Sequence, residues 1–509
     1  MDDRHVVTIA GSRAGKGVSA IVPVLCTYPG SVVCIDPKGE NAALTARRRG
    51  FGTSSVEGMG QEVYVLDPYE IADTDTLYRG TFDPLAGLGP DAPHTQEEVS
   101  LVVEALVVAG ETKDVHWDDS ARNLIEAIIL HVVSWEELKA PRNLVTMYKL
   151  LRDGDTASRD AMLESVQKKH GEVPAWAEEL SGFDILLMDM SRNDAFDGFI
   201  SGAASGLRDL GKQERGSILS TARRNTKFLS ASEMQACLSA SDHELSLEEL
   251  RTASRGITIY VVLPARLMAQ HARWLRLLLN LTLSRLERMG PVKSKRPVLA
   301  ILDEFPTLGY METLENAVGY MAGFGLKIWA ILQDLPQLKR HYEHGWETFL
   351  GNAGLLQFFG NSDSTTLTYI SERLGKTELI RETETQSDTE TTTITDISDF
   401  EKLQHATKAS GLDGFLKSFQ VDEKTETTSH SIARSASLNA AIHTTPLMTP
   451  DEISRFFARE TNLQIAILPR ARPMVLRRTS YFNDPFFTGK YEKMDGPVVK
   501  RDEAGPPAA

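Results

Sequence analysis

The sequence predicts an α/β protein in which a mostly parallel, twisted sheet carries a phosphate-binding loop and an all-α domain is inserted into the chain. Three observations lead to this fold class. A strand, a glycine-bearing turn and a helix follow one another near residue 10, continuous apolar strands alternate with helices after them, and strand-like runs almost vanish between residues 95 and 210. With 509 residues, the chain is long enough to bury a large core and to divide into two or three domains.

The first informative stretch joins a β-branched run at residues 5–9 to an apolar helix expected over residues 18–25. Backbone N–H groups in such a turn form a nest at a helix N-terminus, where they can hold a polyphosphate. Lys16 then supplies the point charge for the β- and γ-phosphates. The sequence therefore predicts a P-loop. Its expected nucleotide-binding residues are Gly11, Ser12, Arg13, Ala14, Gly15, Lys16, Gly17 and Val18.

Two positions depart from the common P-loop pattern G-x-x-x-x-G-K-[ST]. Ala10 stands where the pattern has glycine, and Gly17 stands where it has the hydroxyl that usually binds Mg²⁺. For this stretch taken alone, an ordinary glycine turn stays an alternative interpretation.

Acidic residues follow two of the later strands. The run at 31–35 is continuously apolar, as expected for a parallel strand buried on both faces, and it leads into the turn 36–40. The run at 297–302 ends in Asp303 and Glu304. Because ligands of open α/β sheets bind at the carboxyl ends of strands, Asp303 is expected to hold the Mg²⁺ shell. Glu304 is expected to accept a proton from the attacking water or to orient it. The alternative is a buried strand that ends in two solvated acids.

A further apolar run at 326–332 is followed by Gln333. A glutamine at this strand end can contact the γ-phosphate or the attacking water, and can report hydrolysis to the neighbouring part of the sheet. Lys16, Glu304 and Gln333 are therefore the predicted catalytic residues.

The domain prediction follows the change in periodicity along the chain. Apolar residues recur at helical spacing after residue 95, as in the group around Val102 and Leu106, although helices that merely flank the sheet remain an alternative. The stretch 377–437 is rich in Thr, Ser and Glu and is expected to form mobile loops or exposed hairpins. The predicted parts are 1–94 (nucleotide-binding domain, first part), 95–210 (all-α domain), 211–490 (nucleotide-binding domain, second part) and 491–509 (loose tail).

Composition limits the classes of partner. A net charge of −15 argues against a protein that coats nucleic acid nonspecifically, so any DNA contact must be local. A basic-edged helix expected to return to the sheet is one candidate lining, and a solvated face is the alternative. Its basic residues are Arg215, Arg223, Arg224 and Lys227.

Two cysteines, Cys26 and Cys34, lie in apolar runs and are expected to be small buried hydrophobes. No signal peptide is recognisable, and no apolar run reaches the roughly 20 residues that span a bilayer. The chain itself is therefore expected to be soluble and cytoplasmic.

Several motifs taken together resemble those of the coupling proteins of type IV secretion, the TraG-like and VirD-type ATPases of conjugation and effector export. They extend over nearly the whole sequence, from residue 5 to about residue 490, and their order and spacing are specific. The motifs are residues 10–17, 36–40, 302–305, 329–338, 446–452 and 481–487.

The resemblance implies a RecA-like P-loop domain with an inserted all-α domain, ATP and Mg²⁺ as ligands, and ATP hydrolysis by a homo-hexamer. It places the protein at the cytoplasmic face of the bacterial inner membrane. The implied partners are secretion-channel proteins, relaxase or effector proteins, and single-stranded DNA. In this family glycine often stands at the position of Gly17, and a water can fill the vacant place at Mg²⁺. Members usually carry an N-terminal membrane anchor, and this sequence shows none.

Two other functions stay open at this point: a soluble DNA translocase of the FtsK/HerA kind, and a nucleotide-binding substrate receptor with little turnover. DNA, protein or both stay open as cargo. The arginine finger of the family is also not placed, because Lys327 is the only basic residue between Glu304 and Gln333. Arg340, Arg373 or another arginine must be considered.

Overall fold

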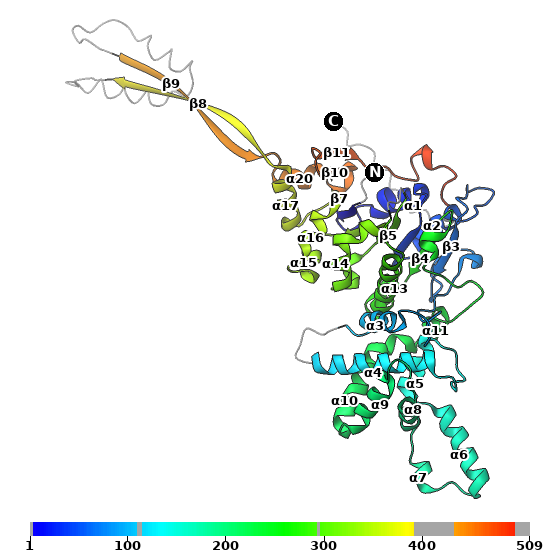
Figure 1. The fold of residues 1–509 in the computed structure, drawn as a ribbon. Coiled ribbons are helices and arrows are strands. Elements are labelled where there is room, and N and C mark those ends of the chain that lie inside the picture. Colours follow the sequence, from blue (N-terminus) through cyan, green and yellow to red (C-terminus); the bar gives the residue numbers. More distant parts are fainter. Residues whose placement is uncertain (1–3, 109–114, 293–295, 391–431, 494–509) are drawn as a thin grey trace, which may run out of the picture. The chain divides into compact units, whose positions relative to one another are not determined.

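The computed structural model describes residues 4–108, 115–292, 296–390 and 432–493 (Figure 1). The chain divides into two compact units. The first combines Met1–Tyr369 with Pro450–Ala509, and the second is Ile370–Thr449.

The first unit is built around a sheet that has nine strands in the described chain, in the order β11-β10-β7-β1-β6-β5-β2-β4-β3. The strands from β7 to β3 pair in parallel, whereas β10 and β11 are antiparallel additions at one edge. The predicted α/β class with a mostly parallel sheet is confirmed, although β7 and β11 were not predicted. The strands are β1 (His5–Ala10), β2 (Val32–Asp36), β3 (Glu62–Leu66), β4 (Ile257–Val262), β5 (Val298–Leu302), β6 (Leu326–Leu332), β7 (Ala353–Phe359), β10 (Leu463–Ile467) and β11 (Met474–Arg477).

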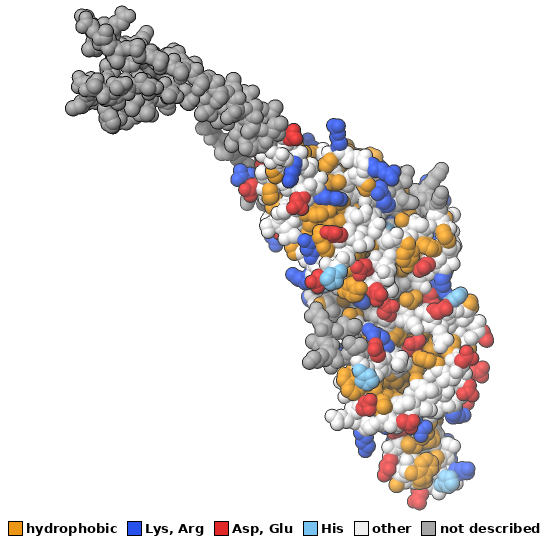
Figure 2. All heavy atoms as spheres, turned by 60° about the vertical axis from the view of Figure 1, so that its left-hand side comes forward, with side chains coloured by type: hydrophobic (Ala, Val, Ile, Leu, Met, Phe, Trp, Pro, Cys, Tyr) orange, Lys and Arg blue, Asp and Glu red, His pale blue; other side chains and the backbone are white. Residues whose placement is uncertain are grey.

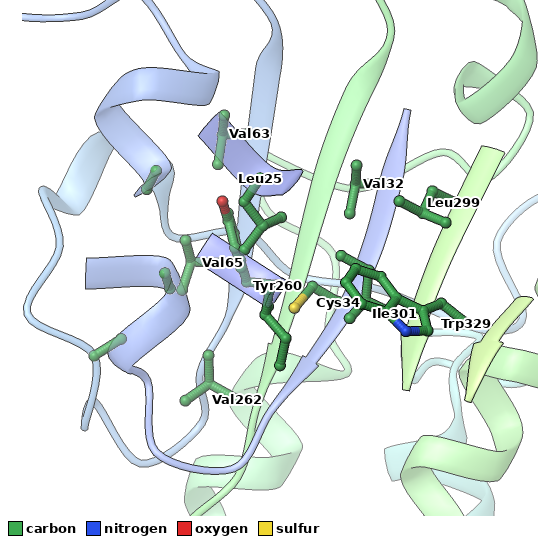
Figure 3. Close-up of a cluster of buried hydrophobic side chains, with 14 of the residues drawn as sticks. Leu25, Val32, Cys34, Val63, Val65, Tyr260, Val262, Leu299, Ile301 and Trp329 are labelled. Carbon is green, nitrogen blue, oxygen red and sulfur yellow. The ribbon is translucent and has the colours of Figure 1, made fainter. Parts of the chain in front are cut away.

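The central strands are apolar along their whole length because helices cover both faces of the sheet. Every residue of β2, β4 and β5 is buried. Figure 3 shows part of this core, in which Leu25 of the helix after the P-loop packs with side chains of the sheet such as Ile301. Cys26 and Cys34 are fully buried free thiols, which confirms the prediction for both.

Helices that follow individual strands flank the sheet (Figure 1). A π-helical turn, Gly17–Ile21, leads from the P-loop into the first of them. The bounds are α1 (Val22–Thr27), α2 (Glu40–Arg49), α13 (Met268–Arg288), α14 (Glu312–Tyr320), α15 (Leu335–His341), α16 (Trp346–Gly351), α17 (Ser364–Leu374) and α20 (Pro450–Phe456). Among the described residues, none of the helices combines the length and apolarity that crossing a bilayer requires.

Between β3 and β4 the regular structure of the described chain consists of helices, and α4 packs against four of them, α3, α5, α9 and α10. The predicted boundary at residues 210 and 211 falls between α9 and α10, which both pack against α4. The helical region therefore continues past that boundary, and its assignment as a separate domain stays a prediction. Its helices are α3 (Thr95–Leu106), α4 (Val115–Ser134), α5 (Leu144–Asp153), α6 (Thr156–His170), α7 (Ala175–Glu178), α8 (Gly182–Ser191), α9 (Phe199–Asp209), α10 (Lys212–Thr226), α11 (Ser232–Cys237) and α12 (Glu249–Thr252).

The first residues of the predicted loose tail are packed. The ring of Tyr491 lies 4.7 Å from that of Tyr481, and Glu492 forms an ion pair of 3.2 Å with Arg47 of α2. A loose segment therefore does not begin at residue 491, and residues 494–509 lie outside the described part of the chain.

The second unit contains an antiparallel strand pair. β8 (Lys376–Glu390) pairs with β9 (Ile432–Pro446) along their whole length. This pair overlaps the stretch 377–437, for which exposed hairpins were one of the two expectations. Residues 391–431 of that stretch lie outside the described residues.

Candidate nucleotide site

The candidate site lies at one edge of the sheet, where neighbouring parallel strands end. The P-loop follows β1, Gln333 follows β6, and Asp303 with Glu304 follows β5. These strands are adjacent in the order β1-β6-β5, and parallel strands have their carboxyl ends at the same edge. The sequence therefore brings all the predicted catalytic and metal-binding residues to one place.

The P-loop backbone has the alternating geometry of an anion-binding nest. Arg13 and Gly15 have positive φ angles of 56° and 90°, while Ala14 N–H donates to the carbonyl of Gly11 at 3.1 Å. Within the described chain, the N–H groups of Ser12, Arg13 and Gly15 have no backbone acceptor. Such unpaired N–H groups in one turn are the donors that bind a phosphate.

Two glycines of the loop differ in the space around them. A Cβ on Gly11 would lie 1.9 Å from the carbonyl oxygen of Gly360, so a side chain there would force the two segments apart. A Cβ on Gly17 would meet no atom within 4 Å. Space therefore does not explain why a hydroxyl side chain is missing at position 17.

Lys16 and Gln333 both contact Glu304 across the three strand ends. Lys16 Nζ lies 3.9 Å from Glu304 Oε1, and Gln333 Nε2 lies 3.4 Å from both carboxylate oxygens of Glu304. Glu304 itself has a φ of 63°, in the left-handed region, which costs a non-glycine residue about 1–2 kcal/mol. Strain of this kind is concentrated at functional sites, and here it sets the direction in which the carboxylate leaves β5.

Asp303 has the burial and the unpaired oxygen that are expected of a cation ligand. Its Oδ1 is buried and has no hydrogen-bond partner in the described chain. Burial raises the pKa of Asp303 to about 6, although the positive charge of Lys16 opposes the shift. No group of three or more His, Cys, Asp or Glu side chains among the described residues could hold a metal ion. A Mg²⁺ ion here would therefore also need phosphate oxygens and water, which is its usual mode of binding.

Asp36 ends β2 at the same edge and has a structural role. Its side chain is 1% exposed, and Oδ2 accepts a hydrogen bond of 2.8 Å from the N–H of Ala42 in the first turn of α2. Burial raises the pKa of Asp36 to about 7. The carboxyl group thus joins the end of β2 to the start of α2.

Sequence reasoning missed three residues beside the P-loop. Gly360 and Asn361 follow β7, and Asn361 Nδ2 donates to the carbonyl of Gln333 at 3.3 Å. Arg478 donates from Nη1 to the carbonyl of Ala14, which is 464 residues away in the chain. A motif search cannot find Arg478, because its partner is a backbone carbonyl and nothing in the local sequence marks the contact.

The basic helix expected to return to the sheet is α10, and that expectation is wrong. α10 packs against α4 and α5 in the helical region. Arg215 Nη2 and Arg223 Nε donate to the carbonyls of Leu210 and Leu151, at 3.4 and 3.1 Å. These two guanidinium groups are therefore engaged within the helical region. Arg224 and Lys227 are exposed, and Nη2 of Arg224 forms an ion pair of 3.6 Å with Asp118 of α4.

The two named candidates for an arginine finger lie in different units. Arg340 is exposed at the end of α15, the helix that begins just after Gln333. Arg373 is in the second unit. In the described chain, the ion pair of Glu304 is with Lys16 and not with an arginine.

Comparison with known families gives one match that covers most of the chain. A family model described as Type IV secretory system Conjugative DNA transfer matches residues 2–408. Conjugal transfer protein TraG of Escherichia coli is 26% identical over 96% of this chain and 68% of its own length. Protein VirD4 of Agrobacterium fabrum is 27% identical over 73% of this chain and 49% of its own length. The chain thus spans about half to two thirds of these relatives.

Solved structures of one bacterial conjugative coupling protein, TrwBdeltaN70, are similar to this chain. The unbound monoclinic form has a TM-score of 0.57 at 14% identity and covers 94% of this chain and 85% of its own. The complex of TrwB with ADP and Mg²⁺ has a TM-score of 0.51 at 13% identity, with coverage of 94% and 86%. At these identities the likeness shows the fold, and that fold is the predicted RecA-like one.

Proposed function

This chain belongs to the type IV secretory system conjugative DNA transfer family, and from that membership we propose that it is an ATP-driven coupling protein of a type IV secretion system. In this proposal it recruits a DNA-bound relaxase, protein substrates or both, and uses ATP hydrolysis to deliver them to the secretion channel.

One observation carries the proposal. Lys16, Glu304 and Gln333 come from three separate strand ends, and both Lys16 and Gln333 contact Glu304. They lie beside a loop in which three N–H groups have no backbone acceptor among the described residues. A solvated strand end does not need a cation, a carboxylate and an amide that converge in this way. A site for a nucleoside triphosphate needs all three.

Each residue has a role that follows from its chemistry. The P-loop N–H groups and Lys16 would bind the β- and γ-phosphates. Glu304 would orient the attacking water or accept its proton, and Gln333 would hold Glu304 in place and sense the γ-phosphate. These contributions act mainly by positioning and by charge, which is how enzymes catalyse phosphoryl transfer.

The residues present fit Mg²⁺, because among the described residues the buried Oδ1 of Asp303 has no hydrogen-bond partner and the place beside Gly17 is open. Asp303 would hold the ion, together with water in place of the hydroxyl that most P-loops carry. Mg²⁺, when bound with the nucleotide, supplies positive charge that neutralises the phosphate oxygens. TrwB, of similar fold, has been solved with ADP and Mg²⁺ and with an ATP analogue, and this supports ATP and Mg²⁺ as the ligands here.

The active form in this proposal is a homo-hexamer, in which a neighbouring subunit supplies the arginine finger. No arginine lies between Glu304 and Gln333 in the sequence, so the local chain offers no finger in cis. Arg340 is a suitable candidate because it is exposed on the helix that follows Gln333.

The proposed partners are secretion-channel proteins, relaxase or effector proteins, and single-stranded DNA. The proposed location is the cytoplasmic face of the bacterial inner membrane. On the face seen in Figure 2, acidic and basic side chains are interspersed, and the net charge is −15. DNA contact would therefore rest on a few local cations rather than on a broad basic surface, and the exposed Lys227 is one candidate.

Gly17 favours a second candidate function, a nucleotide-binding substrate receptor with little turnover. Without the hydroxyl, Mg²⁺ would be held less firmly and hydrolysis would be slow. Glu304 argues for hydrolysis, because a receptor needs no group that orients water.

Nucleotide binding by the parent, Lys16→Ala and Lys168→Ala proteins tests the proposal. Lys168 is an exposed lysine of α6 that is paired with Glu164 at 4.0 Å. Its substitution by alanine removes the same charge as Lys16→Ala, but far from the P-loop in the sequence. A fluorescent ATP analogue should bind the parent and Lys168→Ala proteins equally, and the Lys16→Ala protein at least tenfold more weakly. Equal binding by all three would contradict a nucleotide site at this loop.

A further inference from the structure

Arg478 connects the C-terminal strands to the P-loop. It directly follows β11 and is 8% exposed. Nη1 donates to the carbonyl of Ala14, and Nη2 donates to the carbonyl of Arg459 at 2.8 Å. The guanidinium carbon lies 4.7 Å from the centre of the Phe359 ring, at the end of β7. Its planar head is therefore held on two sides by hydrogen bonds and on one face by an aromatic ring.

The contact with Ala14 fixes a peptide plane and not only a side chain. The carbonyl of Ala14 and the N–H of Gly15 belong to one trans peptide, so they point in opposite directions. The Gly15 N–H is one of the three unpaired donors of the loop. Because Arg478 holds the carbonyl on its own side, the N–H of Gly15 is directed to the other side.

The same peptide would otherwise rotate easily. Gly15 has a φ of 90°, and glycine passes between backbone conformations with little steric cost. On the other side of Ala14, a Cβ added to Gly360 would lie 2.6 Å from the Ala14 side chain, so the methyl group of Ala14 packs closely against the backbone of Gly360. The N–H of Gly360 in turn donates to the carbonyl of Phe457 at 2.7 Å.

We propose that Arg478 is a positioning residue of the nucleotide site, which fixes the Ala14–Gly15 peptide so that the Gly15 N–H faces the phosphates. The inference rests on the proposed nucleotide-binding function. It adds to that function a contribution from the C-terminal strands, whereas the other site residues follow β1, β5 and β6. The guanidinium also places a positive charge behind the loop, where it favours a bound anion.

Three variants separate the positioning role of Arg478 from its packing against Phe359 and from its positive charge. Arg478→Met keeps an apolar side chain against Phe359 but has no donor. Arg478→Lys keeps the charge but cannot reach two carbonyls with a planar fork. Arg477→Ala is the matched control, because Arg477 is the preceding residue, carries the same charge and is exposed. All variants are compared at a temperature at which circular dichroism shows them folded.

Two measurements follow. The first, without nucleotide, is hydrogen exchange of peptides that cover residues 11–19, where Ala14 N–H and Ser19 N–H donate to the carbonyls of Gly11 and Gly15. The second is the affinity for a fluorescent ATP analogue. Loss of a hydrogen bond from a charged group should weaken binding about tenfold or more in Arg478→Met. Exchange in residues 11–19 should accelerate, Arg478→Lys should be intermediate, and Arg477→Ala should match the parent.

Rescue gives a readout that a purely structural role would not move. In Arg478→Ala, millimolar guanidinium should restore part of the nucleotide affinity, whereas equal urea or NaCl should not. Parent-like affinity and exchange in Arg478→Met would overturn the proposal while the proposed function stands. Faster exchange throughout the chain, with no excess at residues 11–19, would also overturn it. If the parent protein binds no nucleotide, the proposed function fails first and this inference fails with it.

Discussion

The ammonium group of Lys16 lies 3.9 Å from Oε1 of Glu304, so a cation from the loop after β1 pairs with a carboxylate from the end of β5. Gln333, from the strand between them, contacts the same carboxylate. A polyphosphate in the P-loop would compete with Glu304 for Lys16 and leave the carboxylate to Gln333 and water. In the proposed function, this ion pair would therefore couple phosphate binding to the orientation of water.

The open space at Gly17 predicts that a hydroxyl can be added there. A Cβ at this position meets no atom within 4 Å, and serine costs less than glycine in a helix. Gly17→Ser should therefore fold normally and reach half-maximal nucleotide binding at a lower Mg²⁺ concentration than the parent. Gly17→Ala is the control, because it adds the Cβ without the hydroxyl. Identical Mg²⁺ titrations for Gly17→Ser and Gly17→Ala would show that the added hydroxyl does not reach the ion.

Because no arginine lies between Glu304 and Gln333 in the sequence, we expect ATPase activity to depend on assembly. The net charge of −15 opposes association, so the protein should be mostly monomeric in dilute solution and hydrolyse ATP slowly. ATPase activity per mole should rise with protein concentration, and further with single-stranded DNA as a template. A dilution series run in parallel with sedimentation checks this. Constant specific activity at concentrations where only monomer sediments would show that the site is complete within one chain.

Because His131 of α4 is buried, we expect the stability of the helical region to depend on pH. The imidazole is 2% exposed and 3.1 Å from Asn193 Nδ2, and burial lowers its pKa from 6.5 to about 4. Between these pH values the unfolded chain binds a proton that the folded chain does not, so stability is lost as the pH falls from about 6.5 to about 4. The loss is about 3 kcal/mol when complete.

Urea unfolding of the parent and His131→Gln proteins at pH 7.5 and pH 4.5 measures this contribution. Buried acids such as Asp36, whose pKa is raised, act in the opposite direction, but they are common to both proteins. The parent should therefore lose more stability on acidification than the variant. Equal losses would mean that His131 is not held neutral by burial.

Much of the site could be predicted from the sequence, because its strands are continuous apolar runs that are followed by acidic or amide residues. The expected strand 326–332 coincides with β6, and Asp303 and Glu304 directly follow β5. β7 was missed because Gln357 interrupts its apolar pattern. In the structure the side chain of Gln357 accepts a hydrogen bond of 2.7 Å from Thr8, so the polar residue is used inside the sheet.

The remaining differences between the predictions and the structure concern tertiary contacts. The amphipathic pattern of α10 shows which face is buried, but not that the partner is α4 rather than the sheet. Arg478 contacts the P-loop through a backbone carbonyl 464 residues away in the sequence. The left-handed backbone conformation of Glu304 could not be predicted, because the residue at that position is not glycine. Local propensities contain no information on contacts of this kind.

In the proposed mechanism Glu304 acts on the water that attacks ATP, and Glu304→Gln removes only the charge that this role requires. Glutamine has nearly the same shape and keeps a polar contact with Gln333, so nucleotide affinity should stay close to that of the parent. Removing a preorganised charge of this kind typically lowers the rate by about 10²–10³. Glu164→Gln, at an exposed glutamate of α6, is the matched control and should hydrolyse ATP at the parent rate.

The deciding measurement is single-turnover ATP hydrolysis by the parent, Glu304→Gln and Glu164→Gln proteins, at a protein concentration and with single-stranded DNA that give the parent its maximal activity. If Glu304 orients or deprotonates the attacking water, the Glu304→Gln protein should bind ATP with parent-like affinity and hydrolyse it on the order of 10²–10³ times more slowly. Hydrolysis by Glu304→Gln at the parent rate would contradict this role of Glu304.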